Sequence, residues 1–333
     1  LAVKKIKYSF PSSSAYHVDG LSYELESQIH LSQGSVDIAV CKPPFLMIPK
    51  RDQYRDLFDE AGLSKCNKLH HITSDLVFLA QNVRLLRQGG ELGIILPDTL
   101  ITRMDFLAFR NAILENHSVE TIIQLPDNIF TKTEARTYIL IIKKGLHTKK
   151  NVKLYKSDRV GNCSKVVEVN SQFLSHRMDF DFIQWSSRKK ASYDKQKSNI
   201  RRLGDIVTGI VRGTYSHNEL NKRGIVHFHT TDFSNSSIKA NYVREFKGQI
   251  AEKGDILLAR VGKRILGRYL KIDKNIPVSD CILVIKPKPG YRNAIFRAIA
   301  SKEGQEWIKM RARGVCARVI SKSELLEFPV YVE

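Results

Sequence analysis

The chain has 333 residues, of which 42% are hydrophobic and 26% are charged, as is typical of a globular protein with a buried core. It contains no run of about 18 apolar residues and no signal-peptide pattern, so we expect no membrane-spanning helix. Its five cysteines are widely spaced, which argues against a disulfide framework or a zinc knuckle and favours a cytoplasmic location. Because the first residue is Leu1 rather than methionine, we expect the chain to be a piece of a longer protein.

Strands and helices alternate in the first half of the sequence. The apolar run Val36–Cys41 predicts a buried strand, which is ended by the prolines of Lys42-Pro43-Pro44-Phe45. The next predicted elements, in chain order, are a helix with apolar positions from Leu76 to Leu86, a strand at 92–96, a helix at 106–114, and strands at 119–125 and 137–142. Thr73 or Ser74 is a candidate cap for the first helix, and Gly89-Gly90 is its predicted end. This order predicts a mostly parallel sheet covered by helices, with the last two strands as an antiparallel edge pair.

The second half of the sequence has a different character. Residues 186–202 are polar and basic, and they predict a linker or an exposed arm. From Leu203 onward, short strands with glycine punctuation are predicted at 204–207, 254–258 and 281–285, with one helix from Ala294 to about Arg311. We therefore predict three parts, namely a partial α/β domain at 1–145, a connector at 146–202, and a β-rich domain with at least one helix at 203–333.

The positive charge is concentrated in the second half. The formal net charge is +20, and residues 1–150 contribute +3 of it whereas residues 151–333 contribute +17. Such a local excess of cations is the expected footprint of a polyanionic partner, although a charge excess also serves solubility. An anionic membrane is the weaker alternative, because no basic amphipathic helix with an aromatic face is evident.

The stretch V-D-I-A-V-C-K-P-P-F, at Val36–Phe45, resembles the catalytic motif of amino-group DNA methyltransferases, which is Asn or Asp followed by Pro-Pro and Tyr or Phe. The target adenine must leave the base stack before its amino group can be reached. In that motif an aromatic ring stacks on the extruded base, while the Asn oxygen and a backbone carbonyl accept hydrogen bonds from the amino group. The motif lies at the carboxyl end of a strand, where ligands bind in open α/β sheets.

Three further segments carry the same resemblance. His17-Val18-Asp19-Gly20-Leu21 is similar to the acidic motif whose Asp contacts the adenine of the cofactor, so the resemblance implies S-adenosylmethionine as cofactor and Asp19 as a contact. Gly89–Leu100 and Val119–Phe130, the latter followed by Thr137–Lys144, resemble strands of the modification subunits of type I restriction systems. The resemblance implies a Rossmann-like methyltransferase sheet whose N-terminal part, with the glycine-rich cofactor loop, is missing from residues 1–145.

Lys42 departs from the motif at the position of its Asn. A charged lysine has donors and no acceptor, so it cannot accept a hydrogen bond from an adenine amino group. A neutral lysine could act as a base, but only after burial had strongly lowered its pKa. Phe45 keeps the aromatic partner, which either stacks on a base or packs at the strand end. Asp19 is either a cofactor contact or a plain cap at a strand end.

Segments of the second half resemble the target-recognition domain of type I restriction specificity subunits. They are, in order, Leu203–Gly213, Gly254–Gly262, Cys281–Pro287 and Val319–Val330. The resemblance implies a compact β-rich domain with a helix, which reads base edges in the major groove.

Basic residues in these segments are the candidate DNA contacts. Arginine can pair with guanine edges or with phosphates, and nearby glycines allow a close backbone approach. The candidates are Arg212, Arg260, Lys263, Arg264, Arg268, Arg313 and Arg318. Most of them are expected to contact phosphates or solvent rather than bases. His227 and His229 share a strand face, and we interpret them as surface histidines rather than as a metal pair, so no metal site is expected.

We hypothesise that the chain is a DNA-binding protein of the adenine-specific, restriction-modification methyltransferase family. In this hypothesis residues 203–333 recognise duplex DNA, and the chain alone does not transfer methyl groups, because of Lys42 and the missing cofactor loop. It would then serve as the specificity partner of an active methyltransferase or restriction subunit. The alternative is an active adenine methyltransferase whose cofactor loop lies upstream of Leu1. RNA binding is a third possibility, because charge alone does not distinguish the two nucleic acids.

Overall fold

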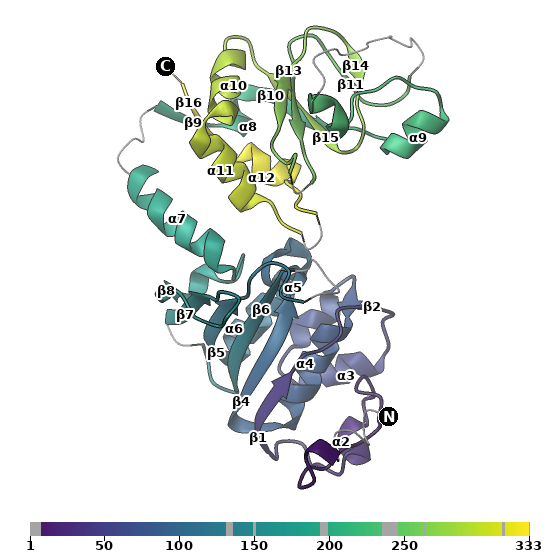
Figure 1. The fold of residues 1–333 in the computed structure, drawn as a ribbon, viewed down its shortest axis with the longest axis vertical. Coiled ribbons are helices and arrows are strands. Elements are labelled where there is room, and N and C mark those ends of the chain that lie inside the picture. The colour runs from purple at the N-terminus through teal and green to yellow at the C-terminus, as the bar shows by residue number, and fades with distance from the viewer. Residues whose placement is uncertain are drawn as a thin grey trace. The chain divides into compact units, whose positions relative to one another are not determined.

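The computed structural model describes residues 8–130, 136–148, 151–193, 199–234, 246–262, 264–314 and 317–332, and for 189–193 the backbone alone. The chain forms two compact units, Leu1–Ile183 and Gln184–Glu333 (Figure 1). The division falls within the stretch 146–202 that the sequence assigns to a connector. Within the described ranges, no helix is long and apolar enough to cross a bilayer.

The first unit contains a six-stranded mixed sheet with the strand order β1-β4-β6-β5-β7-β8. Its strands are β1 (Val36–Cys41), β4 (Leu86–Pro97), β5 (His117–Gln124), β6 (Thr137–Lys144), β7 (Asn151–Lys156) and β8 (Val167–Asn170). β1 is parallel to β4 and β5 is parallel to β7, whereas β4/β6, β5/β6 and β7/β8 are antiparallel. The prediction of an α/β fold is confirmed, but the prediction of a mostly parallel sheet is wrong.

The predicted antiparallel pairing of the last two strands is present, but it does not form an edge of the sheet. β6 pairs with β4 on one side and with β5 on the other, and β7 and β8 extend the sheet beyond β5. These two additional strands lie in the segment where the apolar pattern weakens. β7 has only two fully buried positions, Val152 and Leu154, so its signal in the sequence is short.

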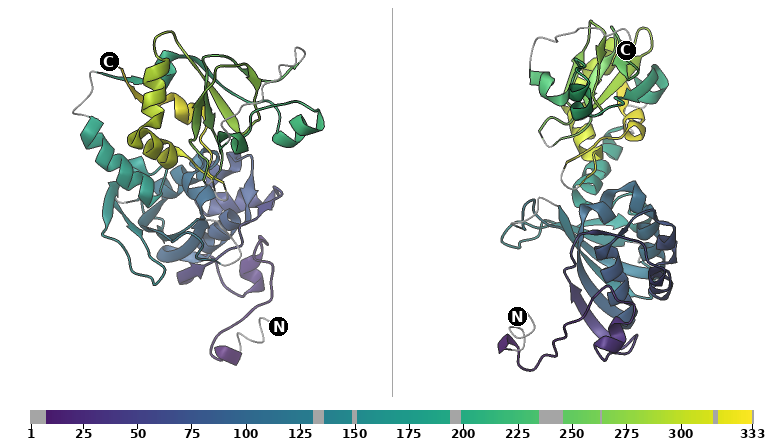
Figure 2. Two further views of the ribbon diagram at one scale, coloured as in Figure 1. Left: turned by 45° about the horizontal axis from the view of Figure 1, so that its top comes forward. Right: turned by 90° about the vertical axis from the view of Figure 1, so that its right-hand side faces the viewer.

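Helices pack on one face of this sheet (Figure 2, right). The helices of the first unit are α2 (Leu25–Gln28), α3 (Gln53–Glu60), α4 (Ser74–Leu85), α5 (Asp98–Thr102) and α6 (Leu107–Asn116), with short 3-10 helices η1 (Ser64–Lys68), η2 (Met104–Phe106) and η3 (Ser171–Phe173). A separate pair of short antiparallel strands is formed by β2 (Met47–Ile48) and β3 (Ile72–Thr73). The fold thus places α4 directly after β3 and beside the end of β1.

The sequence predicted that Gly89-Gly90 would end the first long helix, and this prediction is wrong. α4 begins at Ser74 after Thr73, as expected, but it ends at Leu85, and Gly89 and Gly90 lie inside the long strand β4. A Cβ atom at Gly90 would lie 3.0 Å from the carbonyl oxygens of Val36 and Asp37. The glycine is therefore needed where β4 passes the start of β1, rather than at a helix end.

The two faces of the sheet differ in their coverage. On one face, completely buried aliphatic side chains pack against the helices, and among them are Leu92, Ile94, Leu140, Ile142 and Ile122. The strand register places Val40 beside Gly93 and Ile141 on the opposite face. There Ile38 is 68% exposed and Val40 is 87% exposed. Strand β1 therefore presents an apolar surface at the edge of the sheet, and the prediction that Val36–Cys41 is a buried strand is wrong.

The second unit is built around a four-stranded antiparallel sheet with the order β10-β15-β12-β13. Its strands are β10 (Val207–Arg212), β12 (Ile256–Ala259), β13 (Tyr269–Lys271) and β15 (Ile282–Pro287). Two small pairs join β11 (Ile250–Ala251) to β14 (Ile276–Pro277) and β9 (Ile200–Arg202) to β16 (Pro329–Tyr331). The helices are α8 (Leu203–Ile206), α9 (His217–Lys222), η5 (Thr230–Ser234), α10 (Arg292–Ala300), α11 (Lys302–Arg311) and α12 (Lys322–Leu326), and α7 (Phe180–Tyr193) spans the division between the units.

Two predicted elements of this unit are wrong in detail. Residues 203–206 form the helical turn α8, and the strand starts only at Val207. The single predicted helix at 294–311 is two helices, because Ser301 interrupts it in an extended conformation and caps α11. The Ser301 Oγ accepts a hydrogen bond from the Gly304 amide at 2.9 Å.

Candidate functional site

The Lys42-Pro43-Pro44-Phe45 turn follows directly on the end of β1. Pro43 is buried and Phe45 is half-buried, whereas Lys42 and Pro44 are exposed. The turn lies at the carboxyl end of the strand, which is the position that the resemblance requires.

Ser74, the first residue of α4, holds this turn in place. Its Oγ donates to the carbonyl oxygen of Pro44 at 2.7 Å and accepts from the amide of Leu46 at 3.0 Å. The Ser74 amide also donates to the Leu46 carbonyl oxygen at 2.9 Å. Sequence reasoning considered Ser74 only as a helix cap, so its contact with the motif was missed.

Lys42 lies next to an aromatic ring that the sequence reasoning did not single out. Its Nζ is 5.1 Å from the ring centroid of Phe130, a cation–π distance. Phe130 is the last residue of the stretch Val119–Phe130, whose resemblance was noted, and it follows the end of β5. The structure therefore places an ammonium group where the resemblance requires a hydrogen-bond acceptor.

The carboxyl ends of β1, β4 and β5 meet at one edge of the sheet, because all three strands run in the same direction. Asp98 follows β4 at this edge and is 4% exposed. Its carboxylate accepts hydrogen bonds from Tyr138 Oη at 2.9 Å and from Thr102 Oγ1 at 2.8 Å. Burial raises the pKa of the Asp98 carboxyl, and the negative charge of Asp179 raises it further. This buried network fixes the strand ends and is shielded from a substrate.

A buried ion pair lies near Asp98. Arg177 donates to both carboxylate oxygens of Asp179, from Nε at 2.7 Å and from Nη2 at 2.8 Å. Both side chains are nearly inaccessible to solvent. A bidentate guanidinium–carboxylate pair of this kind is geometrically specific, so it fixes the conformation of residues 177–179, and the Met178 amide ties this segment to α5 through the Ile101 carbonyl oxygen at 3.1 Å.

Asp19 lies in an exposed turn. Its Oδ1 accepts from the Leu21 amide at 3.0 Å, and its carbonyl oxygen accepts from the Ser22 amide at 3.0 Å. Of the cofactor contacts that the resemblance implies, the described residues contain Asp19, and its carboxylate is engaged in its own turn.

Six of the seven predicted DNA contacts lie within the described residues, and Lys263 lies outside them. Arg212 ends β10, Arg260 follows β12, and Arg268 precedes β13. The pairs Arg212↔Leu283 and Ala259↔Ile282 place these strand ends at the same end of the sheet. The structure thus brings the predicted arginines together, with Arg264 in the same β12–β13 connection.

Asp280 accepts hydrogen bonds from two of these arginines. Arg212 donates from Nη2 to the Asp280 carboxylate at 2.6 Å and from Nε to its carbonyl oxygen at 2.9 Å. Arg260 donates from Nη1 to the same carbonyl oxygen at 3.2 Å. Burial lowers the pKa of Arg260, and the neighbouring Arg212 charge lowers it further. Both guanidinium groups are thereby held in fixed orientations.

Arg313 and Arg318 differ in their surroundings. Arg313 donates from Nη2 to the Glu324 carboxylate at 2.6 Å, and both side chains are 14% exposed. Arg318 lies beside the connection after β12, because the Gly262 amide donates to its carbonyl oxygen at 3.0 Å. Its Nη1 donates to the carbonyl oxygen of Lys309 at 3.1 Å.

His227 and His229 belong to a cluster of three histidines that includes His217 from α9. His217 Nδ1 lies 2.8 Å from His227 Nε2, and the rings of His217 and His229 stack with centroids 4.1 Å apart. Within the described ranges, no group of three or more potential metal ligands has a geometry that could hold a metal ion. The third histidine could not be assigned from the sequence, because a helix and a loop bring it to the others.

A family model described as N-6 DNA Methylase matches residues 2–197, which is more than half of the chain. The chain belongs to the N-6 DNA methylase family. The methylase subunit of the type I restriction enzyme MpnII from Mycoplasma pneumoniae is 25% identical over 115 residues, which are 34% of this chain and 21% of that subunit.

A solved structure with a similar fold matches nearly the whole chain. The type IIL restriction-modification enzyme MmeI in complex with DNA matches with a TM-score of 0.52 at 10% identity, over 98% of this chain and 51% of MmeI. A type I methyltransferase subunit from Streptococcus thermophilus is 25% identical over 43% of this chain and 29% of that subunit, with a TM-score of 0.34. The chain thus spans about a fifth of the curated relative and about half of MmeI.

Proposed function

We propose that this chain binds duplex DNA through its second unit and does not transfer methyl groups by itself. The observation that carries the proposal is the cluster of arginines at one end of the β10-β15-β12-β13 sheet, within a half of the chain that bears a net charge of +17. In this proposal residues 203–333 act as the target-recognition domain, 146–202 as the connector and 1–145 as the partial methyltransferase domain.

The β12–β13 connection has the properties of a DNA-contacting loop. Arg264 and Arg268 are exposed on it, and Gly267 turns the backbone with a φ of 79°. A Cβ atom at Gly267 would lie 3.2 Å from Ile308 Cγ2, so the glycine also allows the loop to lie close to α11. Arg212 is held by Asp280 but keeps 49% of its side chain exposed. These three guanidinium groups are available to phosphates or to guanine edges.

Lys42 supports the second part of the proposal. An extruded adenine beside Phe45 would meet an exposed ammonium group that can donate but not accept. A positive charge there also opposes the positive charge that develops on the attacking nitrogen. Since such sites depend on preorganised acceptors, we propose that this chain acts with an active methyltransferase or restriction subunit, which would supply S-adenosylmethionine binding.

A salt titration of binding to a labelled duplex tests the DNA-binding proposal. We expect the logarithm of affinity to fall linearly with the logarithm of salt concentration, and the Arg264→Gln, Arg268→Gln double variant to bind more weakly with a shallower slope. The matched control is Lys253→Gln, Lys274→Gln, which removes two exposed charges from the opposite end of the same sheet. Equal losses in both variants, or preferential binding of double-stranded RNA in competition, would contradict the proposal.

The alternative of an active adenine methyltransferase is favoured by one observation, namely that the Pro-Pro-Phe turn is intact and is pinned by Ser74. Methyl transfer from tritiated S-adenosylmethionine to DNA by the complete gene product separates the two functions. Incorporation by the wild type would favour the alternative. A silent wild type that gains activity on Lys42→Asn would instead support the proposed loss of function at Lys42.

A further inference from the structure

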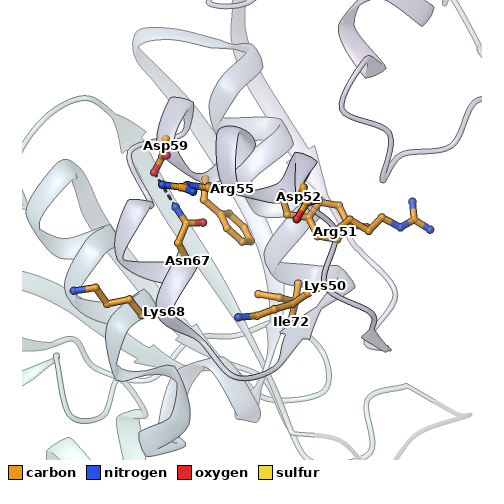
Figure 3. Close-up of a pocket in the computed structure, with 10 residues that line it drawn as sticks. Lys50, Arg51, Asp52, Arg55, Asp59, Asn67, Lys68 and Ile72 are labelled. Carbon is orange, nitrogen blue, oxygen red and sulfur yellow. Dashed lines mark hydrogen bonds between the residues drawn. The ribbon is translucent and has the colours of Figure 1, made fainter.

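A basic hollow of about 420 Å³ lies beside α3 in the first unit (Figure 3). Its floor is formed by the buried side chains of Tyr54, Phe58 and Ile72. Its rim carries four cations and three other polar side chains: Lys50, Arg51, Arg55, Lys68, Asp52, Asp59 and Asn67. The hollow therefore combines an aromatic floor with an excess of positive charge at its mouth.

Among the residues that the structure describes, the cations of this rim have no carboxylate partner. Some exposed cations elsewhere in the first unit pair with acids, as Lys65 does with Glu115 and Arg87 with Asp37. Within the part of the chain that the structure describes, Lys50, Arg51, Arg55 and Lys68 form no ion pair, although Asp52 and Asp59 line the same hollow.

One of the two acids on the rim, Asp59, is engaged by a neighbouring side chain. Asp59 accepts a hydrogen bond from the Asn67 amide at 2.9 Å, which holds its carboxylate at η1 (Figure 3). Arg51 points away from the hollow and lies 5.9 Å from the Tyr54 ring centroid. Lys50, Arg55 and Lys68 remain around the hollow as hydrogen-bond donors. Such a set of donors is suited to a phosphate group.

The hollow is directly connected to the Lys42–Phe45 turn. Ile72, on its floor, pairs with Ile48 in the β2/β3 ladder, and Lys50 follows β2 by two residues. Lys50 is five positions after Phe45, so the two lie within roughly 17 Å of each other along an extended chain. That reach corresponds to a few nucleotides of a DNA strand.

We propose that this hollow binds a backbone phosphate of the DNA strand that passes the Phe45 turn, with Lys50, Arg55 and Lys68 as its ligands. The inference rests on the proposed DNA binding and adds a contact in the first unit, which sequence reasoning did not assign. Phosphate contacts fix the position of a strand without reading its sequence. The site would therefore position the strand for an adenine at Phe45.

The experiment compares two duplexes, one fully paired and one with a single unpaired adenine, which costs least to extrude. Affinity is measured by fluorescence anisotropy over a range of salt for the wild type and for the Lys50→Gln, Arg55→Gln, Lys68→Gln triple variant. We expect the triple variant to lose about tenfold in affinity for the bulged duplex, and its salt slope to fall by about 0.9, the value for one released phosphate contact. The loss for the paired duplex should be smaller.

Two controls make the outcome specific. Lys65→Gln removes a neighbouring cation that is already paired with Glu115, so it should leave the salt slope unchanged. Thermal melting of each variant shows whether it is folded, and three single variants replace the triple variant where it is not.

The results separate this inference from the proposed function. If the wild type binds DNA and the Arg264→Gln, Arg268→Gln variant weakens binding, while the triple variant keeps the wild-type slope, the phosphate site is overturned and the proposed function stands. If the wild type binds no DNA, both are overturned. If inorganic phosphate or AMP shifts the amide resonances around Lys50 and Arg55 but the DNA slope stays unchanged, the hollow binds small anions and the inference is wrong.

Discussion

The Nζ of Lys42 lies 5.1 Å from the ring centroid of Phe130, so the cation of the altered motif rests against an aromatic residue that follows another strand. An exposed cation–π contact of this kind stabilises by about 0.5–1 kcal/mol. We expect a double-mutant cycle of Lys42→Gln and Phe130→Ala to give a coupling of about this size in urea denaturation. Lys42→Arg should retain most of the coupling, and a value near zero in the cycle would show that the two side chains act independently.

Ser74 should prove important for the geometry of the motif turn. In Ser74→Ala the Pro44 carbonyl oxygen and the Leu46 amide lose their side-chain partner. Because the residue is buried, we expect a loss of about 1–3 kcal/mol in the free energy of unfolding. Ser74→Thr retains the hydroxyl and serves as the comparison. Equal stability of the Ala and wild-type proteins would mean that the turn is held by other contacts.

Asp75 should make stability depend on pH. Burial raises the pKa of its carboxyl to about 6, whereas an exposed aspartate titrates near 4. The contribution of Asp75 to the free energy of unfolding is therefore most favourable below about pH 4, and it is lost as the pH rises to about 6. Asp75→Asn removes this dependence, and it should stabilise the protein at pH 7.5 by at most about 3 kcal/mol. The measurement is the melting temperature of both proteins between pH 4.5 and pH 7.5, where the difference should grow with pH.

Arg313 is expected to act on stability more than on DNA binding. Its guanidinium is paired with Glu324, and both side chains are 14% exposed. Arg313→Gln leaves a largely buried carboxylate with a weaker set of donors, so we expect about 1–3 kcal/mol of destabilisation. The salt slope for duplex DNA should stay within error of the wild type. A shallower slope at unchanged stability would instead make Arg313 a phosphate contact.

The exposed apolar surface of β1 should govern the solubility of this chain when it is isolated. Ile38 and Val40 lie on the uncovered face at 68% and 87% exposure, and an exposed apolar edge strand favours association. We expect Ile38→Lys, Val40→Lys to raise the concentration at which light scattering first detects association, with little change in the melting temperature. Lysine at Ala39, on the buried side of the same strand, is the control and should destabilise the fold.

Much of the first unit could be predicted because its signals are local. The apolar run of β1 ends at two prolines, and α4 begins at Ser74 where the cap was expected. The place of β6 between β4 and β5 could not be predicted, because strand order depends on contacts between segments that lie far apart in the sequence. The short strand β7 was missed, because two buried positions do not establish a period.

The site was predictable in its motif but not in its surroundings. Lys42 is read directly from the sequence, as is its lack of an acceptor. The fold is needed to bring Phe130 and Ser74 into contact with the motif turn, and to form the hollow beside α3. In the second unit the arginines were identified by type, whereas the ion pair between Arg313 and Glu324 depends on the packing of α12.

The close approach at Gly90 limits how β1 and β4 can be replaced by the corresponding segments of related proteins. The β4 backbone passes so close to the start of β1 that a methyl group at position 90 would press on two of its carbonyl oxygens. Any larger side chain would move β1, and with it the turn that β1 carries at its other end. Strands β1 and β4 therefore have to be exchanged together. A chimaera that replaces one of them without the other would misplace the motif even if every residue of the motif were kept.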